Sequence, residues 1–467
     1  MKSDSGISVV IAGGGFCGLM TLVNLIKKSS HKISITLINK GYPLARGVAF
    51  HSYSELHLLN VEARNMSAFA DQPEHFVEWC RSYNEVGTHA DDIPTTYFPR
   101  NLYGKYLLDI FNSSISDLDP NIKVNLVDDE MSDIEKNEES FIVYTSQGKK
   151  IQADKIVLAT GNCEPGPPVL NNPEFIKSKK YFSNPWSEQA VLNLKNNDDV
   201  LIIGSGLTMA DVIIGLREKD FTGKIISLSP HGFNILPHRK STPQRYILDE
   251  LNPPYTLENL FRLFYKHIRQ ARKHGQSGET VVDAIRAKTQ EIWQNISHDD
   301  KKKFMTHLRH LWGVARHRLP SKIHSQIQQM IQDKKLEIIA GRIKNINDCE
   351  NGIEVIAQRR KDQSELVIKV ARIINCTGPQ TDIRKQNSAL YNSLLKKGMI
   401  RPDEMNLGID ANSEFQVIEA NNNTCESIYA IGSLLKGKLW ESTAVPELRS
   451  QASRLADALV KVSAIEL

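Results

Sequence analysis

The chain has 467 residues, which is the length of two or three ordinary domains. Its 40% hydrophobic and 24% charged residues are typical of a soluble globular protein, and a net charge of +4 favours neither nucleic acid nor a membrane surface. No apolar run approaches the roughly 20 residues that cross a bilayer, and the N-terminus has no signal-peptide pattern, so we expect a cytoplasmic protein without membrane insertion.

The first predicted element is a strand at residues 7–12 that runs into a glycine cluster. Apolar residues at helical spacing follow up to Ile26, and residues 33–38 alternate as a second strand. This order is typical of a Rossmann fold that binds a dinucleotide, because glycines allow a tight turn and close approach of the pyrophosphate to the start of the helix. The predicted pyrophosphate contacts are Gly13, Gly14, Gly15, Phe16, Cys17 and Gly18.

An acidic residue usually ends the second strand of such a fold and binds the ribose hydroxyls. Here Asn39 stands at that position. We expect it to bind the adenosine ribose without the charge-assisted strength of a carboxylate. The alternative for the whole motif is a glycine-rich turn that holds no ligand.

The same plan recurs further along the chain. Short strands at 123–127, 141–144 and 151–158 form a predicted meander that ends at Thr160 and Gly161, which we expect to contact the cofactor. A strand at 200–203, a second glycine turn and a helix follow, and a second predicted meander at 336–339, 353–357 and 366–374 closes on another Thr-Gly pair. Two copies of one pattern are more specific than either glycine motif alone.

The second glycine turn is predicted to bind a nicotinamide dinucleotide through Gly204, Ser205, Gly206, Leu207 and Thr208. Met209 replaces the third glycine, so the alternative is a degenerate domain kept as a scaffold. No arginine lies directly after the following strand, where one would mark the 2′-phosphate of NADPH, although Arg239 and Lys240 lie downstream. The choice between NADPH and NADH stays open.

Three domain segments follow from this order: an FAD-type first part at 1–190, a nicotinamide-type domain at 191–375, and a return segment at 376–467. Apolar residues at helical spacing predict a helical insertion at about 241–330. The return segment contains a buried strand at 427–431, followed by Gly432 and Ser433, and a helix from about Pro446 to Leu459.

Both glycine motifs, the Ala-Thr-Gly at 159–161 and the late strand before Gly432 resemble flavoproteins with two dinucleotide-binding domains. Longer strings, at 46–50, 57–64, 312–320 and 439–449, are similar to a bacterial FAD/NAD(P)-binding family related to flavin-dependent monooxygenases, including N-hydroxylases and a urate hydroxylase. The resemblance implies an α/β, glutathione-reductase-like fold of two Rossmann-like domains, with FAD at the first turn and NADPH or NADH at the second. Ser433 departs from the Asp that many relatives carry against the flavin ribityl chain.

Several residues are candidates for the chemistry. Ser442 or Thr443 is predicted to cap the last helix beside the flavin, with an ordinary surface cap as the alternative. Asn60 could bond the flavin ring or a peroxide as the catalytic contact, or could be a buried turn asparagine. The candidate substrate contacts are Arg64, Arg316, Arg318 and Trp440, and the two later arginines could equally lie on a solvated helix face.

The leading hypothesis is an FAD-dependent, NAD(P)H-using monooxygenase that hydroxylates a small polar or nitrogen-containing molecule through a flavin hydroperoxide. One alternative is a dehydrogenase that passes electrons to a quinone or a protein. The other is a non-catalytic flavoprotein sensor or binding module. The six cysteines form no CxxC pair, which counts against a disulfide reductase and a zinc ribbon, and we expect no metal. The sequence does not indicate the oligomeric state.

Overall fold

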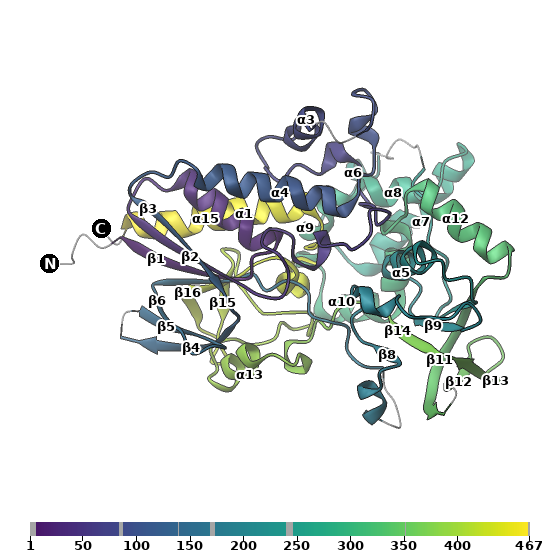
Figure 1. Ribbon diagram of the computed structural model, residues 1–467. Coiled ribbons are helices and arrows are strands. Elements are labelled where there is room, and N and C mark those ends of the chain that lie inside the picture. The colour runs from purple at the N-terminus through teal and green to yellow at the C-terminus, as the bar shows by residue number, and fades with distance from the viewer. Residues whose placement is uncertain are drawn as a thin grey trace. The chain divides into compact units, whose positions relative to one another are not determined.

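The computed structural model describes residues 6–83, 87–138, 140–168, 173–239, 246–350 and 352–465. The chain divides into two compact units (Figure 1), each described by itself below. Unit 1 comprises Met1–Glu55, Val61–Cys163 and Thr381–Leu467, and unit 2 comprises Leu56–Asn60 and Glu164–Gln380. The divisions therefore fall at 163/164 and 380/381, where the sequence suggested 190/191 and 375/376, and a short early segment joins unit 2.

Unit 1 is built on a sheet with the strand order β15-β16-β7-β1-β2-β3. Its neighbouring strands are parallel except for the pair β15 and β16. Helices α1, α4 and α15 lie along one side of this sheet (Figure 1), and α1 packs against both of the others. The strands are β1 (Ile7–Ala12), β2 (Ile33–Asn39), β3 (Ile122–Asp128), β7 (Lys155–Leu158), β15 (Gln416–Ile418) and β16 (Thr424–Ala430).

A small antiparallel sheet, β4-β5-β6, also belongs to unit 1, and helix α13 packs on β4. Its strands are β4 (Met131–Asn137), β5 (Ser140–Thr145) and β6 (Lys150–Ala153). The helices of unit 1 are α1 (Phe16–Lys28), α2 (Gly47–Phe50), α3 (His75–Ser82), α4 (Arg100–Ile115), α13 (Ala389–Lys396), α14 (Lys436–Leu439) and α15 (Val445–Ile465).

The three strands predicted to form the first meander do not form one sheet. Strand β3 pairs in parallel with β2, and the segment 151–158 splits at Asp154 into β6 and β7, which belong to different sheets. The Asp154 carboxylate accepts hydrogen bonds from the Ser8 backbone N–H at 2.7 Å and the Ser8 hydroxyl at 2.9 Å. This clamp ties the start of β7 to β1, so the chain leaves the small sheet at this residue.

Unit 2 repeats the plan with the strand order β13-β12-β11-β10-β9-β14-β8. Strands β8 to β11 and β14 pair in parallel, while β12 and β13 add antiparallel pairs at one end. The predicted strand 366–374 again splits, at Ala371, whose N–H donates to the Asp199 carbonyl. The strands are β8 (Tyr181–Phe182), β9 (Val200–Ile203), β10 (Ile225–Ser229), β11 (Leu336–Cys349), β12 (Gly352–Arg359), β13 (Glu365–Val370) and β14 (Arg372–Asn375).

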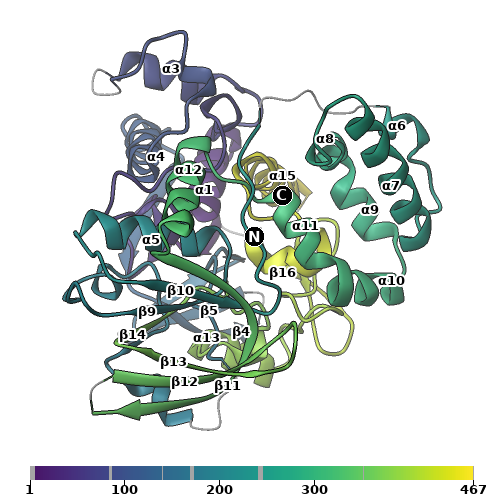
Figure 2. The same ribbon diagram turned by 90° about the vertical axis from the view of Figure 1, so that its right-hand side faces the viewer.

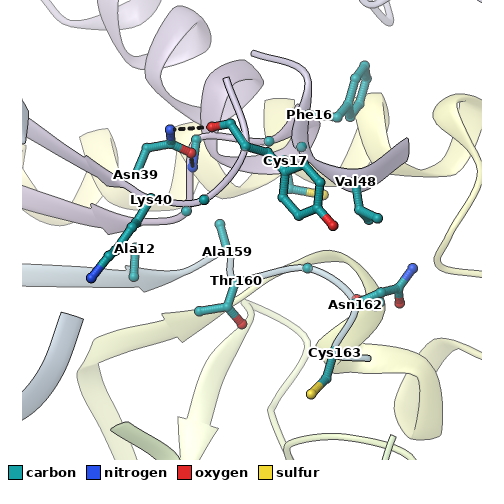
Figure 3. Close-up of a pocket in the computed structure, with 18 of the residues that line it drawn as sticks. Ala12, Phe16, Cys17, Asn39, Lys40, Val48, Ala159, Thr160, Asn162 and Cys163 are labelled. Carbon is teal, nitrogen blue, oxygen red and sulfur yellow. Dashed lines mark hydrogen bonds between the residues drawn. The ribbon is translucent and has the colours of Figure 1, made fainter. Parts of the chain in front are cut away.

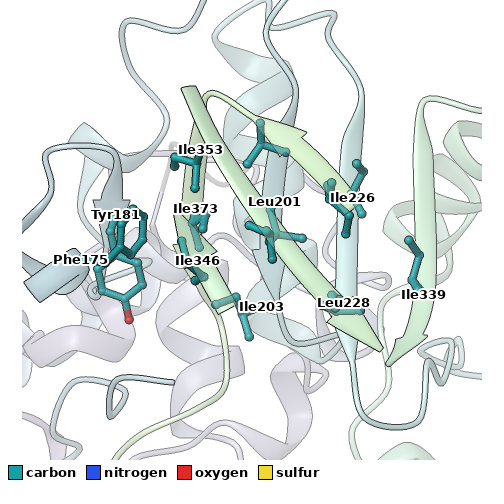
Figure 4. Packing of buried hydrophobic residues seen from close by; sticks show 14 residues of the cluster. Phe175, Tyr181, Leu201, Ile203, Ile226, Leu228, Ile339, Ile346, Ile353 and Ile373 are labelled. Carbon is teal, nitrogen blue, oxygen red and sulfur yellow. The ribbon is translucent and has the colours of Figure 1, made fainter. Parts of the chain in front are cut away.

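Buried aliphatic residues from these strands form one continuous core (Figure 4). Leu201, Leu228 and Ile373 from three neighbouring strands are each at most 1% exposed. Both faces of a parallel sheet are covered in such folds, so the sequences of its strands are continuous apolar runs and do not alternate between apolar and polar residues. The core holds the ends of β9, β10 and β14 in a fixed relation, and the second glycine turn follows β9.

The described part of the predicted insertion is helical, and residues 240–245 lie outside the described residues. Figure 2 shows α6 to α9 gathered into one helical layer. The apolar run at 305–312 is divided by a π-helical turn at Phe304–Leu308. The helices of unit 2 are α5 (Leu207–Glu218), α6 (Ile247–Glu250), α7 (Leu257–Lys273), α8 (Glu279–Ala284), α9 (Thr289–Asn295), α10 (His298–Lys303), α11 (Arg309–Arg316) and α12 (Ser321–Gln332).

The two units share the strand order β3-β2-β1-β7 and β11-β10-β9-β14. In each, the first strand leads through a glycine turn into a helix, α1 or α5, and then into a parallel neighbour. This confirms the predicted α/β fold with two Rossmann-like units and helices inserted in the second.

Candidate functional site

The first glycine turn joins β1 to α1 and uses its glycines in two different ways. Gly13 has φ +110°, and its N–H donates to the Ile38 carbonyl at 2.8 Å. A Cβ at Gly13 would collide with the Ala159 carbonyl, and a Cβ at Gly18 would collide with the Gly13 carbonyl. Gly15 differs, since a Cβ there would have only the Gly47 Cα as a protein neighbour, at 3.7 Å. Gly13 and Gly18 therefore serve the packing, while Gly15 leaves space open for a ligand.

This division predicts different effects of the same small substitution. Gly18→Ala is expected to lower the free energy of unfolding of the apo-protein by about 3 kcal/mol, because the new methyl overlaps a backbone carbonyl. Gly15→Ala, the matched control, is expected to leave that stability nearly unchanged. Urea unfolding of both FAD-free variants measures the difference, and equal stabilities would contradict the packing role of Gly18.

A pocket opens beside this turn, at the carboxyl ends of the parallel strands, where open α/β sheets bind their ligands. Besides the glycine turn, three segments line the pocket: Arg46–Phe50, residues 159–163 after β7, and residues 386–388. In Figure 3, Asn39 and Lys40 lie at one end of the view and Asn162 and Cys163 at the other. The predicted residues that the pocket brings together are Gly13, Gly14, Gly15, Phe16, Cys17, Asn39, Thr160, Gly161, Ser433, Ser442 and Thr443.

Gly18 and Gly432 are not among the residues that line this pocket. Gly432 has φ +77°, and a Cβ at this position would lie 2.7 Å from the Cys17 sulfur. Gly432 thus allows the end of β16 to approach the glycine turn closely, and Ser433 follows it into the pocket.

Asn39 lines the pocket, but its side-chain amide forms hydrogen bonds with backbone groups of the protein. Its Oδ1 accepts from the Gly14 N–H at 3.2 Å, and its Nδ2 donates to the Tyr42 carbonyl at 2.9 Å (Figure 3). Asn39 therefore holds the glycine turn to the loop after β2. The acidic groups at this end are Asp129 and Glu130, which follow β3 and also line the pocket. Sequence reasoning missed them, although the pairing of β3 beside β2 brings Asp128 opposite Asn39.

Three polar side-chain atoms from pocket-lining residues are buried and have no hydrogen-bond partner among the described residues. They are Arg46 Nε, Ser433 Oγ and Ser442 Oγ. A buried polar atom left unsatisfied costs about 1–3 kcal/mol, so these atoms fit a pocket that receives polar ligand groups. FAD offers such groups as pyrophosphate oxygens and ribityl hydroxyls, and the donor set therefore fits FAD.

The prediction that Ser442 or Thr443 caps the last helix is wrong. Helix α15 begins at Val445, and the Ala444 carbonyl accepts the N–H groups of Glu447 and Leu448 at 3.1 and 3.0 Å. Ala444 has no side-chain acceptor, so no side chain at the cap position bonds the first turn of α15, whose residue Val445 lines the pocket. Pro446 lies in the first turn, as predicted.

Tyr391 from α13 also lines the pocket, and its hydroxyl is hydrogen-bonded to Thr160 Oγ1. Burial raises the pKa of the Cys17 thiol to about 12, so this thiol is neutral at pH 7. None of the six cysteines forms a disulfide. Within the described residues, no group of three or more His, Cys, Asp or Glu side chains could hold a metal ion.

The second glycine turn has almost the same backbone geometry as the first. Gly204 has φ +111°, and its N–H donates to the Leu228 carbonyl at 2.8 Å. A Cβ at Gly204 would lie 2.5 Å from the Cys376 carbonyl, while one at Gly206 would meet no atom within 4 Å. Met209, only 1% exposed, is packed into the interior without changing this turn. The third glycine is therefore dispensable for the turn itself.

The remaining predicted cofactor residues of unit 2 extend this turn. Ser205 Oγ lies 2.9 Å from Ser229 Oγ at the end of β10, and Leu207 and Thr208 begin α5. The space at Gly206 and the start of α5 together provide the two features that a pyrophosphate requires: close approach and a positive helix end.

The structure does not gather the predicted catalytic and substrate residues into the pocket of unit 1. Asn60 belongs to unit 2, where its backbone carbonyl lies 2.9 Å from His238 Nε2. Arg64 is exposed and pairs with Glu62 at 2.5 Å. Trp440 is 9% exposed, with Lys436 Nζ 5.6 Å from its ring centroid.

Arg318 is corrected from a candidate substrate contact to a structural residue. Its side chain is 7% exposed and forms an ion pair with Asp283 inside unit 2. Removal of Asp283 would leave the buried charge of Arg318 uncompensated, which is strongly destabilising. Arg316, two residues earlier, ends helix α11. Arg239, considered for the 2′-phosphate, lies 3.5 Å from Glu279, and Lys240 falls outside the described residues.

Residues 92–381 match the model of the L-lysine 6-monooxygenase/L-ornithine 5-monooxygenase family, and residues 10–163 match an FAD-NAD(P)-binding family. The first match covers more than half of the chain. The chain belongs to the L-lysine 6-monooxygenase/L-ornithine 5-monooxygenase family. It is therefore an FAD-dependent, NAD(P)H-using monooxygenase of a nitrogen-containing substrate, which confirms the leading hypothesis and the predicted cofactors.

Three solved structures of flavin-dependent hydroxylases share the fold of this chain. The ornithine N-hydroxylase of Kutzneria sp. 744, in a structure with reduced FAD, NADP+ and L-ornithine, has 12% identity and a TM-score of 0.68. The ornithine hydroxylase of Pseudomonas aeruginosa has 13% identity and a TM-score of 0.66. The L-lysine 6-monooxygenase of Pseudomonas syringae has 13% identity and a TM-score of 0.62. Each alignment covers 98% of this chain and 99% of the other.

No protein of curated function matches the chain by sequence. Among the described helices of this monooxygenase, none is both long and apolar enough to cross a membrane.

Proposed function

We propose that this monooxygenase hydroxylates the side-chain amine of a small amino acid, with FAD in the pocket of unit 1 and NADPH or NADH at the second glycine turn. The observation that supports FAD in unit 1 is the set of unsatisfied polar atoms on Arg46, Ser433 and Ser442 in the pocket beside an open glycine turn. When bound, FAD would accept a hydride from NAD(P)H and, once reduced, would react with oxygen.

The chain's own groups divide the work of holding FAD. The open backbone at Gly15, the start of α1 and the Arg46 guanidinium bind the pyrophosphate. Glu130 accepts hydrogen bonds from ribose hydroxyls in place of Asn39, whose amide is already engaged. Ser433 and Ser442 bond the ribityl and flavin portion, and the positive end of α15 favours the anionic reduced ring.

The substrate class rests on the family, whose description names lysine and ornithine. Asn60, Arg64, Arg316 and Trp440 stay predicted contacts of the flavin or substrate. We place the protein in the cytoplasm because none of the six cysteines forms a disulfide, as is usual in reducing compartments.

The other two functions considered from the sequence receive less support. A sensor that has lost nicotinamide binding would be expected to have a distorted second turn, yet Gly204 and Gly206 keep the geometry of the first turn despite Met209. A dehydrogenase that passes electrons to a quinone or a protein receives no support from the family match, whose description names monooxygenases.

The test begins with the purified yellow protein, mixed without oxygen with NADPH and then with NADH. Bleaching of the flavin absorbance is expected, and its absence with both nucleotides would refute the enzymatic function. Oxygen is then admitted with L-ornithine, L-lysine or, as matched control, 1,4-diaminobutane, which lacks the carboxylate. We expect an amino acid product heavier by one oxygen atom in mass spectrometry, in proportion to NAD(P)H consumed. NAD(P)H oxidation without any hydroxylated amine would refute the substrate class, and rapid quinone reduction alone would favour a dehydrogenase.

A further inference from the structure

Helices α3 and α4 of unit 1 lie next to each other (Figure 1) and are joined by aromatic rings that the proposed function has not used. These rings form a row that begins at Phe50, which lines the pocket of unit 1 and lies 4.5 Å from Tyr103 between ring centroids. Tyr103 lies 5.3 Å from Tyr106. Tyr106 in turn lies 5.4 Å from the half-buried Trp79. The row therefore leads from the pocket through two tyrosines and away from it.

Hydrophobic packing alone does not account for the phenol of Tyr103. Its side chain is 0% exposed, and its hydroxyl has no hydrogen-bond partner among the described residues. Because an unsatisfied buried polar group is destabilising, phenylalanine would serve a hydrophobic core better at this position. Tyrosine differs from phenylalanine in that it loses an electron readily. The phenol at Tyr103 thus indicates a role in electron transfer beside the pocket.

Tyr106 differs from Tyr103 because its hydroxyl has a proton acceptor. Tyr106 Oη accepts from the Ala68 N–H at 3.2 Å and lies 2.8 Å from His75 Nδ1. With the ring hydrogen of His75 on Nε2, Nδ1 accepts the phenol hydrogen. Burial lowers the pKa of His75, although the charge of Glu78 opposes this, so the imidazole is neutral at pH 7. Burial raises the pKa of Tyr106, so the phenol keeps its proton while it is reduced.

This pair can hold an oxidising equivalent. A phenol that has lost an electron is a strong acid, and it transfers its proton to a neutral base within hydrogen-bond reach. Removal of one electron from Tyr106 therefore breaks its O–H bond and moves the proton to His75 Nδ1. The products are a neutral tyrosyl radical and an imidazolium. Return of the electron brings the proton back, so the cycle consumes no reductant.

We propose that Tyr103 and Tyr106 form an electron relay that quenches light-excited oxidised FAD in the pocket of unit 1. Tyr103 donates one electron to the excited flavin and recovers it from Tyr106, whose proton moves to His75. The oxidising equivalent then rests two rings away from the pocket until the electron returns. The inference rests on the proposed function in one respect: FAD must occupy the pocket of unit 1.

Two other phenols reach the pocket directly, so a weak flavin fluorescence does not by itself test the relay. Tyr42 and Tyr391 both line the pocket and can donate an electron at short range. Neither is altered by a substitution at Tyr106. Dependence of the radical on Tyr106 is therefore the decisive readout.

The test is a laser flash on the FAD-loaded protein without oxygen or nicotinamide, followed by time-resolved absorption and electron paramagnetic resonance. We expect a long-lived tyrosyl radical, whose resonance narrows in protein made with ring-deuterated tyrosine. Tyr106→Phe keeps the ring and is expected to abolish this radical. Tyr144→Phe, the matched control, removes a phenol from β5 outside the pocket lining and is expected to leave the radical unchanged.

Two further variants test the separate steps. His75→Phe keeps a ring against Phe69 but removes the proton acceptor. The lifetime of the radical is expected to fall by roughly 10- to 100-fold, the effect of losing a charge-assisted hydrogen bond. Tyr103→Phe keeps the pair of Tyr106 and His75 and is expected to lower the yield of the radical. FAD content and circular dichroism show whether each variant remains folded and loaded.

The contradicting results are also distinct. Absence of a tyrosyl radical in the FAD-loaded parent, a radical on Trp79 in its place, or an undiminished signal in Tyr106→Phe would refute the inference. Each would leave the proposed function standing, because hydroxylation in the dark does not use the relay. Full retention of FAD in Gly15→Val would instead refute the FAD site of unit 1, on which the inference rests.

Discussion

Gly15→Val is expected to give a folded protein that purifies without FAD. The residue has an extended backbone, with φ −75° and ψ −168°, which valine adopts readily. A Cβ here meets no protein atom closer than the Gly47 Cα at 3.7 Å, so the added side chain occupies the space that the pyrophosphate needs. An overlap of this kind costs about 3 kcal/mol, which corresponds to at least a roughly 100-fold loss of FAD affinity.

The ratio of flavin to protein absorbance and the rebinding of added FAD measure this effect. Circular dichroism of the purified variant shows whether the fold persists. The melting temperature is expected to fall toward that of apo-protein, because a ligand that binds only the folded state no longer contributes. A variant that keeps its full complement of FAD would show that the pyrophosphate does not lie at this turn.

Gly206→Val applies the same change to the second turn and is expected to impair nicotinamide binding instead of FAD binding. Gly206 has φ −94° and ψ −169°, and a Cβ there meets no protein atom within 4 Å. FAD should be retained, while anaerobic reduction of the flavin by NADPH or NADH should be slowed by roughly 100-fold at subsaturating nucleotide, on the same overlap argument.

Stopped-flow measurement of flavin bleaching tests this, with dithionite as a reductant that does not require the second turn. Normal reduction by dithionite combined with slow reduction by NAD(P)H locates the defect at the nucleotide. Reduction by NAD(P)H at the parent rate would mean that the second turn is scaffold. Gly15→Val and Gly206→Val serve as controls for each other, because each places the same side chain on the same backbone conformation in a different unit.

Local features of the chain were predictable from the sequence because they depend on consecutive residues. The apolar runs at 7–12 and 200–203 became β1 and β9, and each glycine turn has its first glycine at positive φ, where side chains are disfavoured. The helix 446–459 was found within α15. Helical periodicity also identified the insertion, although the π-turn at Phe304–Leu308 left no signal in the apolar spacing.

Errors arose where a residue's role depends on a distant partner. Asp154 separates β6 from β7, where Ser8 binds its carboxylate, and the local sequence around 154 does not reveal that partner. Ser442 and Thr443 have the chemistry of a cap, but α15 starts only at Val445. Arg318 was read as an open cation, and its burial against Asp283 follows from the packing of unit 2.

The sequence by itself determined that this protein has two dinucleotide turns, since strand, glycine turn and helix are encoded within one short stretch of chain. Only the tertiary structure decided which side chains meet at each turn. The parallel sheet of unit 1 brings Arg46, Glu130 and Ser433 to one pocket, and unit 2 brings Ser229 at the end of β10 to Ser205 of its glycine turn. The physical reason is that backbone conformation depends on neighbours in sequence, whereas the charge and hydrogen-bonding capacity of a site depend on neighbours in space.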